Sequence, residues 1–237
     1  MGKLTEDIAL RDKRYVFEDR IEAGCLLAHA LMHLKSSDCI VLAIPSGGLP
    51  FASEIADALA IPMDLVIVRK IQIPLNTEAG FGAMAPDGDI ILNEKLLLQL
   101  NLTGDEINRQ AIKTSENIRE RNQRFREGRP YIPPEHDTVI IVDDGLASGY
   151  TMLAAIRFVK RTGAQKRIVA GVPTGSKRTV NLVLPEVDEL VCLNVRSGFP
   201  FAVADAYRNW HDLTDKEALA IVKKRTGIPM NRKENVR

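Results

Sequence analysis

Five short apolar runs recur along the chain, and longer amphipathic segments separate them. Each run is continuously hydrophobic rather than alternating, which is typical of strands in a parallel sheet whose two faces are both covered. The predicted strands are 39–44, 63–68, 138–143, 167–172 and 189–195, and the clearest helical patterns are 18–35, 51–60 and 150–162. This alternation predicts an α/β fold, with a doubly wound, mainly parallel sheet and flanking helices.

Two regions depart from this alternation. Residues 71–89 are rich in Gly and Pro, and a loop of that length inside a compact domain is typically a functional lid. Residues 103–127 form a long charged helix with a thin apolar stripe. Its acidic residues are interleaved with its basic ones at pairing distance, which favours a solvated or oligomer-facing helix over a nucleic-acid patch.

The two ends of the chain are less regular than its middle. No linker or repeat divides the sequence, so residues 1–237 are expected to form one domain, with 1–20 and 196–237 available as a small hood. Thr214 or Asp215 followed by Glu217 and an apolar run predicts a capped helix in the second segment.

Composition narrows the class of protein. The chain has 237 residues, 45% hydrophobic and 27% charged, with a net charge of +1, which indicates a globular protein without a general affinity for nucleic acid or membranes. Its charged N-terminus and short apolar runs predict a cytoplasmic protein. The three cysteines (Cys25, Cys39 and Cys192) are widely spaced and predict reduced thiols, and the four histidines complete no metal-binding pattern.

The most informative stretch is "VIIVDDGLASGYT" at residues 139–151. Asp143 and Asp144 emerge where the strand ends, and a loop with two glycines then enters a helix. Amides at a helix N-terminus bind phosphate, while adjacent carboxylates can accept hydrogen bonds from the two hydroxyls of a ribose. The pattern therefore predicts a site for a ribose 5-phosphate, with the phosphate in the loop and the diol on the acids.

Better-known phosphate-binding and nucleophile motifs fit this stretch poorly. The sequence lacks a Walker A motif, and neither a G-x-G-x-x-G loop nor a G-x-S-x-G elbow follows a predicted strand. An ordinary Asp-Asp-Gly turn is the structural alternative. The combination of an apolar strand, two acids and G-x-x-S-G-x-T favours a ligand site over that turn.

This stretch closely resembles the ribose-phosphate signature of the type I phosphoribosyltransferases. Two further motifs resemble the same family in the same order: "AIPSGGLPFA" (43–52) matches its pyrophosphate loop, and "VRKI" (68–71) matches a basic pair that precedes a mobile loop. The matches span about residues 39 to 195. The resemblance implies 5-phosphoribosyl 1-diphosphate as ligand and Mg²⁺ as cofactor, with the metal held mainly by the substrate.

The resemblance also implies roles for individual residues. Asp143 and Asp144 would hold the ribose diol, and Arg69 and Lys70 would neutralise the pyrophosphate; these four are the candidate catalytic residues. The 5-phosphate would lie on the amides of Gly145, Leu146, Ala147, Ser148, Gly149, Tyr150 and Thr151, helped by the Ser148 and Thr151 hydroxyls. Ser46, Gly47 and Gly48 would offer amides to the pyrophosphate, through a strained or cis peptide.

One departure from the family leaves two functions open. Many relatives carry Arg or Lys where this chain has Ser46, so the loop lacks a positive charge. The chain is expected to be a phosphoribosyltransferase that exchanges pyrophosphate for a nitrogen base, and the alternative is a sensor of 5-phosphoribosyl 1-diphosphate or a nucleotide.

The expected partners are small molecules, with no nucleic acid or membrane and a possible homodimer. The sequence does not identify the acceptor base. The aromatic residues Phe199, Phe201, Tyr207 and Trp210 either stack on that base or, as we favour, form a small core under a loop.

Overall fold

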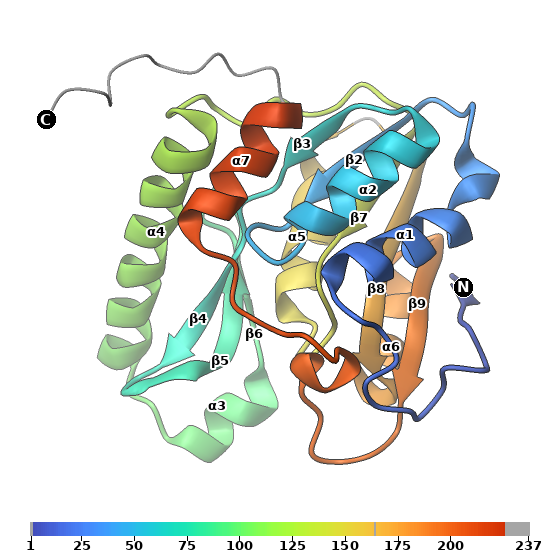
Figure 1. Cartoon of the computed structure of the whole chain (residues 1–237). Helices are drawn as coiled ribbons and strands as arrows, with labels where there is room; N and C mark the ends of the chain where they lie inside the picture. Colours follow the sequence, from blue (N-terminus) through green and yellow to red (C-terminus); the bar gives the residue numbers. More distant parts are fainter. Residues whose placement is uncertain (1, 164, 226–237) are drawn as a thin grey trace, which may run out of the picture.

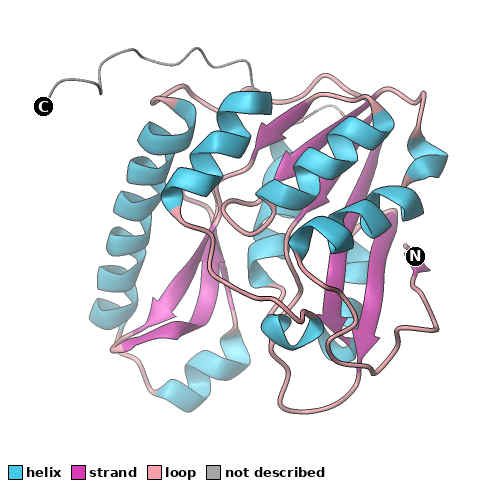
Figure 2. Cartoon of the chain, in the orientation of Figure 1, coloured by secondary structure: helices cyan, strands magenta, loops and turns pink. Residues whose placement is uncertain are grey.

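The structure is a computed structural model that describes residues 2–163 and 165–225. Its centre is a sheet of six parallel strands in the order β1-β9-β8-β7-β2-β3 (Figure 1; Figure 2 separates helices from strands). These strands are β1 (Lys3–Thr5), β2 (Cys39–Ala43), β3 (Met63–Leu65), β7 (Thr138–Val142), β8 (Arg167–Ser176) and β9 (Glu189–Arg196). The five predicted strands are all present, and the expected doubly wound parallel sheet is confirmed.

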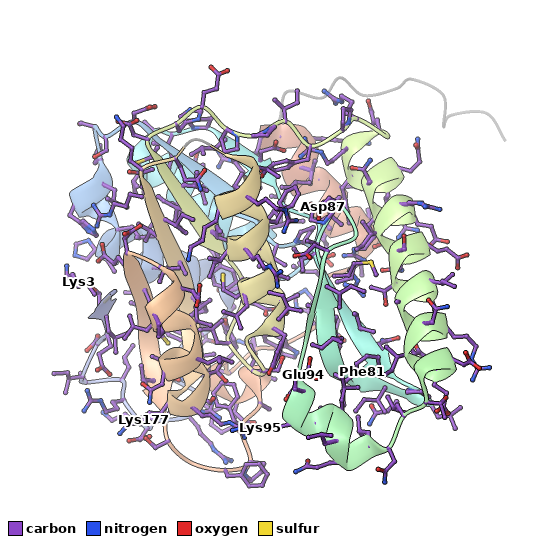
Figure 3. All side chains as sticks on the ribbon, turned by 180° about the vertical axis from the view of Figure 1, so that it is seen from behind. Lys3, Phe81, Asp87, Glu94, Lys95 and Lys177 are labelled. Carbon is purple, nitrogen blue, oxygen red and sulfur yellow. The ribbon has the colours of Figure 1, made fainter. Side chains whose placement is uncertain are left out.

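Helices cover both faces of this sheet. Helices α1 (Arg20–Ala30) and α2 (Leu49–Leu59) lie on one face; α5 (Tyr150–Thr162) and α6 (Lys177–Val183) lie on the other, seen from behind in Figure 3. Successive side chains of β2 alternate between two cores: Val41 packs with α1 and α2, and Leu42 packs with α5. Burial on both faces explains why the strands read as continuous apolar runs.

The order of the strands reverses beside β2. From β2 the chain passes through α2 to β3 on one side, whereas β7 leads through α5 and α6 to β8 and β9 on the other. The pairing of Ala43 with Val142 brings β2 and β7 to the same level, and the Ile44 amide donates to the Val142 carbonyl at 2.9 Å. The loops after β2 and β7 therefore leave the sheet side by side and diverge, as at the ligand-binding switch points of other α/β sheets.

The prediction of a long loop at 71–89 is wrong. These residues belong to a three-stranded antiparallel sheet of β4 (Arg69–Ile73), β5 (Asn76–Met84) and β6 (Ile90–Leu92). Pro74 and Gly88 lie in the turns, while Phe81 is fully buried between the strands and the neighbouring helices (labelled in Figure 3). Turn residues at the strand ends, together with glycines inside β5, gave the segment the composition of a loop.

Two helices pack against the small sheet. Helix α3 (Glu94–Leu100) follows β6, and α4 (Gly104–Arg126) runs along β4 (Figure 1). The reciprocal bonds between Thr103 and Glu106 begin α4 as a capping box. The predicted apolar stripe of α4 is used inside the chain, since Ile118 packs on β4 and β5 and Phe125 joins the larger core.

The two end segments lie in different places: the N-terminal one borders the β9 edge of the main sheet, and the one after β9 runs across to α7 beside α4 (Figure 1). The N-terminal segment supplies β1, which extends the main sheet beside β9 and was not predicted. After β9 come a 3₁₀ turn (Val203–Ala206) and α7 (Asp215–Arg225), which Thr214 and Glu217 cap as expected. Tyr207 is buried and Trp210 packs beside it as parts of the large core under α1 and α2, rather than of a separate small core, whereas Phe199 is exposed. Residues 226–237 of the predicted hood lie outside the described residues.

Two shorter 3₁₀ turns complete the architecture, at Met32–Leu34 after α1 and at Leu184–Glu186 after α6. Cys39 and Cys192 are buried in the core, Cys25 is exposed, and all three are free thiols. Within residues 2–163 and 165–225, no helix combines the length and the apolar character needed to cross a bilayer.

Candidate functional site

A cleft of about 440 Å³ opens where the loops after β2 and β7 diverge. All the predicted site residues except Gly48 and Tyr150 line it, so segments about a hundred positions apart in sequence meet at one place. The small sheet adds Ala79 and Gly80 to the wall, and the segment after β9 adds Val203. These residues, together with Val68 and Met152, were not predicted.

The loop after β2 holds its shape by close packing. The peptide between Pro45 and Ser46 is cis, in agreement with the expected strained or cis peptide. A Cβ on Gly47 would lie 2.4 Å from an Asp144 carboxylate oxygen, so glycine is required for the two loops to touch. Gly48 is buried and its amide donates to the Ile44 carbonyl at 2.9 Å, so of the three residues predicted for the pyrophosphate only Ser46 and Gly47 line the cleft.

The loop after β7 is fixed from the side of β8 and α6. The Leu146 amide donates to the Thr174 carbonyl at 2.9 Å, and the Ala147 carbonyl accepts a bond from the Thr179 hydroxyl at 2.7 Å. Gly149 then enters α5 with φ +82°, a left-handed conformation that favours glycine. The first amides of a helix have no partner within it, so the start of α5 presents donors beside Ser148 and Thr151.

The two acids share this cleft in a charged surrounding. Burial, and then the negative charge of Asp144, raise the pKa of Asp143 well above its ordinary value. Burial also raises the pKa of Asp144, although Arg20 opposes that shift. Arg69 and Arg20 both favour the ionised form of Asp143, so each acid has a cation within electrostatic range.

Arg20 is a site residue that the sequence did not reveal. It is the first residue of α1, it is buried, and its guanidinium lies 3.7 Å from the Asp144 carboxylate. The His211 carbonyl accepts a hydrogen bond from Arg20 at 2.5 Å, and the Trp210 ring lies under the guanidinium. The Tyr207 hydroxyl donates to the Asp144 carbonyl at 2.9 Å, so the segment after β9 helps to hold this acid in place.

The basic pair directly follows the predicted strand 63–68, but in the structure it belongs to the second sheet. Arg69 and Lys70 are the first residues of β4 in the small sheet, and both line the cleft. Burial lowers the pKa of Arg69, while Asp143 opposes this change. The cation is thereby placed opposite the acid pair by the small sheet rather than by the main one.

A second arginine reaches the loop after β2 from far away in sequence. Arg121 lies on α4, and its guanidinium donates to the Ser46 hydroxyl oxygen at 2.7 Å. Burial and the neighbouring charge of Arg69 lower the pKa of Arg121 to about 10. Nothing in the charged sequence around Arg121 distinguishes it from the other arginines of that helix.

Comparisons with known proteins agree with this architecture. The family model of the phosphoribosyl transferase domain matches residues 20–206. Proteins from two strains of Mycobacterium tuberculosis, provisionally named as phosphoribosyl transferases, are each 37% identical over 207 residues, or 87% of this chain. The crystal structure of TT1426 from Thermus thermophilus is 34% identical and superposes with a TM-score of 0.70, covering 88% of this chain and 98% of that one.

The chain therefore belongs to the phosphoribosyltransferase family. It spans 46% of the length of the two mycobacterial relatives. The part of this chain that matches the family model, residues 20–206, contains the acid pair and both loops of the cleft.

The raised pKa of Asp143 predicts that Asp143→Asn stabilises the unliganded protein. The folded state holds a proton on this acid more tightly than the unfolded chain does, so stability falls as the pH rises through the interval between the two pKa values. At pH 7 we expect the variant to gain about 1–2 kcal/mol, or roughly 2–8 °C in Tm, in thermal unfolding.

The gain should shrink as the pH falls through the raised pKa of Asp143, because the folded wild type then carries a proton on this acid. It should vanish near about pH 4, where the unfolded chain is protonated as well. Asp137→Asn serves as the control, because Asp137 is exposed and pairs with Lys166 at the surface. A gain in Tm that stayed the same at every pH would contradict the proposed cause.

Proposed function

We propose that this protein is a phosphoribosyltransferase that uses 5-phosphoribosyl 1-diphosphate and transfers its 5-phosphoribosyl group to a nitrogen base, with release of pyrophosphate. The observation that carries the proposal is the meeting of Asp143 and Asp144 with the start of α5 in one cleft. Acids for a diol and amides for a phosphate lie within one sugar's reach of each other, which is the arrangement that a ribose 5-phosphate needs.

In the proposed reaction, the bond between the ribose C1 and the pyrophosphate oxygen breaks and a bond from C1 to a nitrogen of the base forms. Positive charge develops on the ribose ring as the leaving group departs. The carboxylates of Asp143 and Asp144 stabilise that charge while holding the ring hydroxyls, and Arg69 and Lys70 stabilise the pyrophosphate on the opposite wall.

The side chains of the cleft fit Mg²⁺, the cofactor proposed for the reaction. Mg²⁺ prefers oxygen ligands and is commonly bound through one or two carboxylates together with substrate phosphates. The paired acids offer carboxylate oxygens beside the proposed diol site, and Asp143 and Asp144 would hold the metal together with the substrate. When bound, the ion neutralises phosphate charge; the protein's part is to orient the sugar and surround the leaving group.

The alternative function is a sensor of the same ligand. It is supported by the absence of a basic residue between Pro45 and Gly48, because a weaker pyrophosphate site slows transfer without preventing binding of the ribose phosphate. The partly buried cations Arg69 and Arg121 near that loop favour the enzyme. Residues 196–214, which supply Val203 to the cleft, are the segment we propose as the hood.

Turnover separates the enzyme from the sensor. We expect the wild type to bind 5-phosphoribosyl 1-diphosphate with Mg²⁺ in calorimetric titration, and to release pyrophosphate when the right base from a panel of purines, pyrimidines and other nitrogen heterocycles is added. Tight binding with no pyrophosphate release for any base would favour the sensor. Failure to bind 5-phosphoribosyl 1-diphosphate and every ribonucleoside monophosphate would contradict both.

The acid pair should control affinity for the ribose. We expect the double variant Asp143→Asn/Asp144→Asn to bind ribose 5-phosphate at least about tenfold more weakly, because two charged hydrogen-bond acceptors are lost. Asp87→Asn/Asp89→Asn is the matched control, since this second acid pair lies in the β5–β6 turn and pairs with Arg161 of α5. Unchanged affinity in the first variant, measured by titration, would show that the diol binds elsewhere.

Gly149 should be required for the phosphate loop. A Cβ at this position would lie 2.6 Å from a Thr179 methyl carbon, so Gly149→Ala displaces the start of α5 and weakens binding of ribose 5-phosphate. Gly88→Ala has a matching backbone, with φ +88°, but open space around its Cβ. Both variants should lose thermal stability from the left-handed conformation, and only Gly149→Ala should lose affinity. Equal affinities would exclude the loop as the phosphate site.

A further inference from the structure

The loop after β2 carries no basic residue, yet a guanidinium touches it. Helix α4 packs along β4 and brings Arg121 to Ser46 across 75 residues of sequence, at 2.7 Å. Ser46 lines the cleft, and Arg121 lies behind it, outside the residues that form the cleft wall. At this place the direct contact with a ligand would therefore be made by Ser46, with Arg121 behind it.

The hydrogen bond between Arg121 and Ser46 determines whether the serine hydroxyl acts as a donor or as an acceptor. A guanidinium has donors and no acceptor, whereas a serine hydroxyl has one donor and two acceptor lone pairs. Ser46 must therefore accept from Arg121, and its own proton remains available for a ligand in the cleft. A hydroxyl bound by a cation is also a stronger donor to an anion, because the positive charge polarises it.

The surrounding charges indicate an anion at this position. The positive charge of Arg69 contributes to the lowered pKa of Arg121, so two guanidinium groups lie near each other in a partly buried place. Within the described part of the chain, neither takes part in an ion pair closer than 4 Å. Their repulsion would be relieved by an anion bound between Ser46 and Arg69, which both line the cleft.

We propose that Arg121 is a positioning residue for the pyrophosphate group: it holds the Ser46 hydroxyl as a polarised donor and replaces, from α4, the positive charge that the loop lacks. This inference rests on the proposed function and goes beyond it by giving a role to a helix outside the cleft. The competing role is a purely structural one, in which Arg121 only ties α4 to the loop, helped by its contact with the Phe125 ring.

The test compares ligands with and without the diphosphate group. Arg121→Ala, Arg121→Lys, Ser46→Ala and the double variant Arg121→Ala/Ser46→Ala are titrated with Mg²⁺-pyrophosphate, 5-phosphoribosyl 1-diphosphate and ribose 5-phosphate. Arg124→Ala is the matched control: Arg124 is on the next turn of α4, where it is half exposed and pairs with Asp215 of α7. Circular dichroism checks that each variant is folded.

We expect Arg121→Ala to weaken binding of pyrophosphate and of 5-phosphoribosyl 1-diphosphate by about tenfold or more, with ribose 5-phosphate changed less than about twofold. The double variant should bind pyrophosphate little worse than Arg121→Ala alone, because both side chains act through one contact. Arg121→Lys should recover part of the loss, and Arg124→Ala should resemble the wild type.

Four results would overturn the inference. The first is an unchanged affinity of Arg121→Ala for pyrophosphate, the second is an equal loss of affinity for ribose 5-phosphate, and the third is additive effects of the two substitutions. Each of these would mean that Arg121 has only a structural role. A wild type that binds no pyrophosphate would do the same, even if it binds ribose 5-phosphate. Arg121-dependent binding of pyrophosphate by a protein that binds neither ribose ligand would instead remove the proposed function and leave the inference standing.

Discussion

The site depends on the register between β2 and β7, which makes the two parallel strands end side by side. Ala43 lies opposite Val142, and the bond from the Ile44 amide to the Val142 carbonyl continues the ladder one residue further. The segments that follow these two strands then separate, because β2 leads to one side of the sheet and β7 to the other. A shift in this register would separate the paired acids from the loop that touches them, and would also turn the buried side chains of β2 to the wrong face.

The paired acids at the end of β7 are stabilised in their charged form by cations from outside the main sheet. Two carboxylates at one strand end repel each other, and burial raises the pKa of both. The cations that oppose this shift come from other parts of the chain: Arg20 begins α1, and Arg69 begins β4. Burial in turn lowers the pKa of Arg69, so the acids and the cation each stabilise the charged form of the other. The cleft is thus polarised before any ligand enters it.

The sequence predicted the main sheet well because burial on both faces leaves a simple pattern of continuous apolar runs. The prediction of a loop at 71–89 failed because glycine is common both in loops and at places where strands approach closely. Gly80 and Gly82 flank a register shift between β5 and β4, where an added Cβ would meet Lys70 and the Ile91 carbonyl at 2.3 and 2.5 Å, so they permit a β-bulge and close approach of neighbouring strands rather than a loop. Strand β1 is short and partly charged, and only its pairing with β9 defines it.

The candidate site was predictable where it is local and not where it is assembled by packing. The acids and the phosphate loop are contiguous, and their order is informative by itself. Arg20 and Arg121 reach the site from α1 and α4 through tertiary contacts, and each is one arginine among several similar neighbours. Gly48 shows the converse limit, since its position in the motif suggested a ligand contact while its amide is used inside the loop.

The contact between Gly47 and Asp144 restricts how this loop can be redesigned. Every other amino acid would bring a β-carbon into the space that the carboxylate fills, so position 47 admits no new chemistry without moving the acid. Position 46 is open to the cleft and already carries a side chain. An attempt to build a basic loop into this scaffold therefore has one residue to work with, and a basic side chain there would remove the hydroxyl that now accepts a hydrogen bond from Arg121.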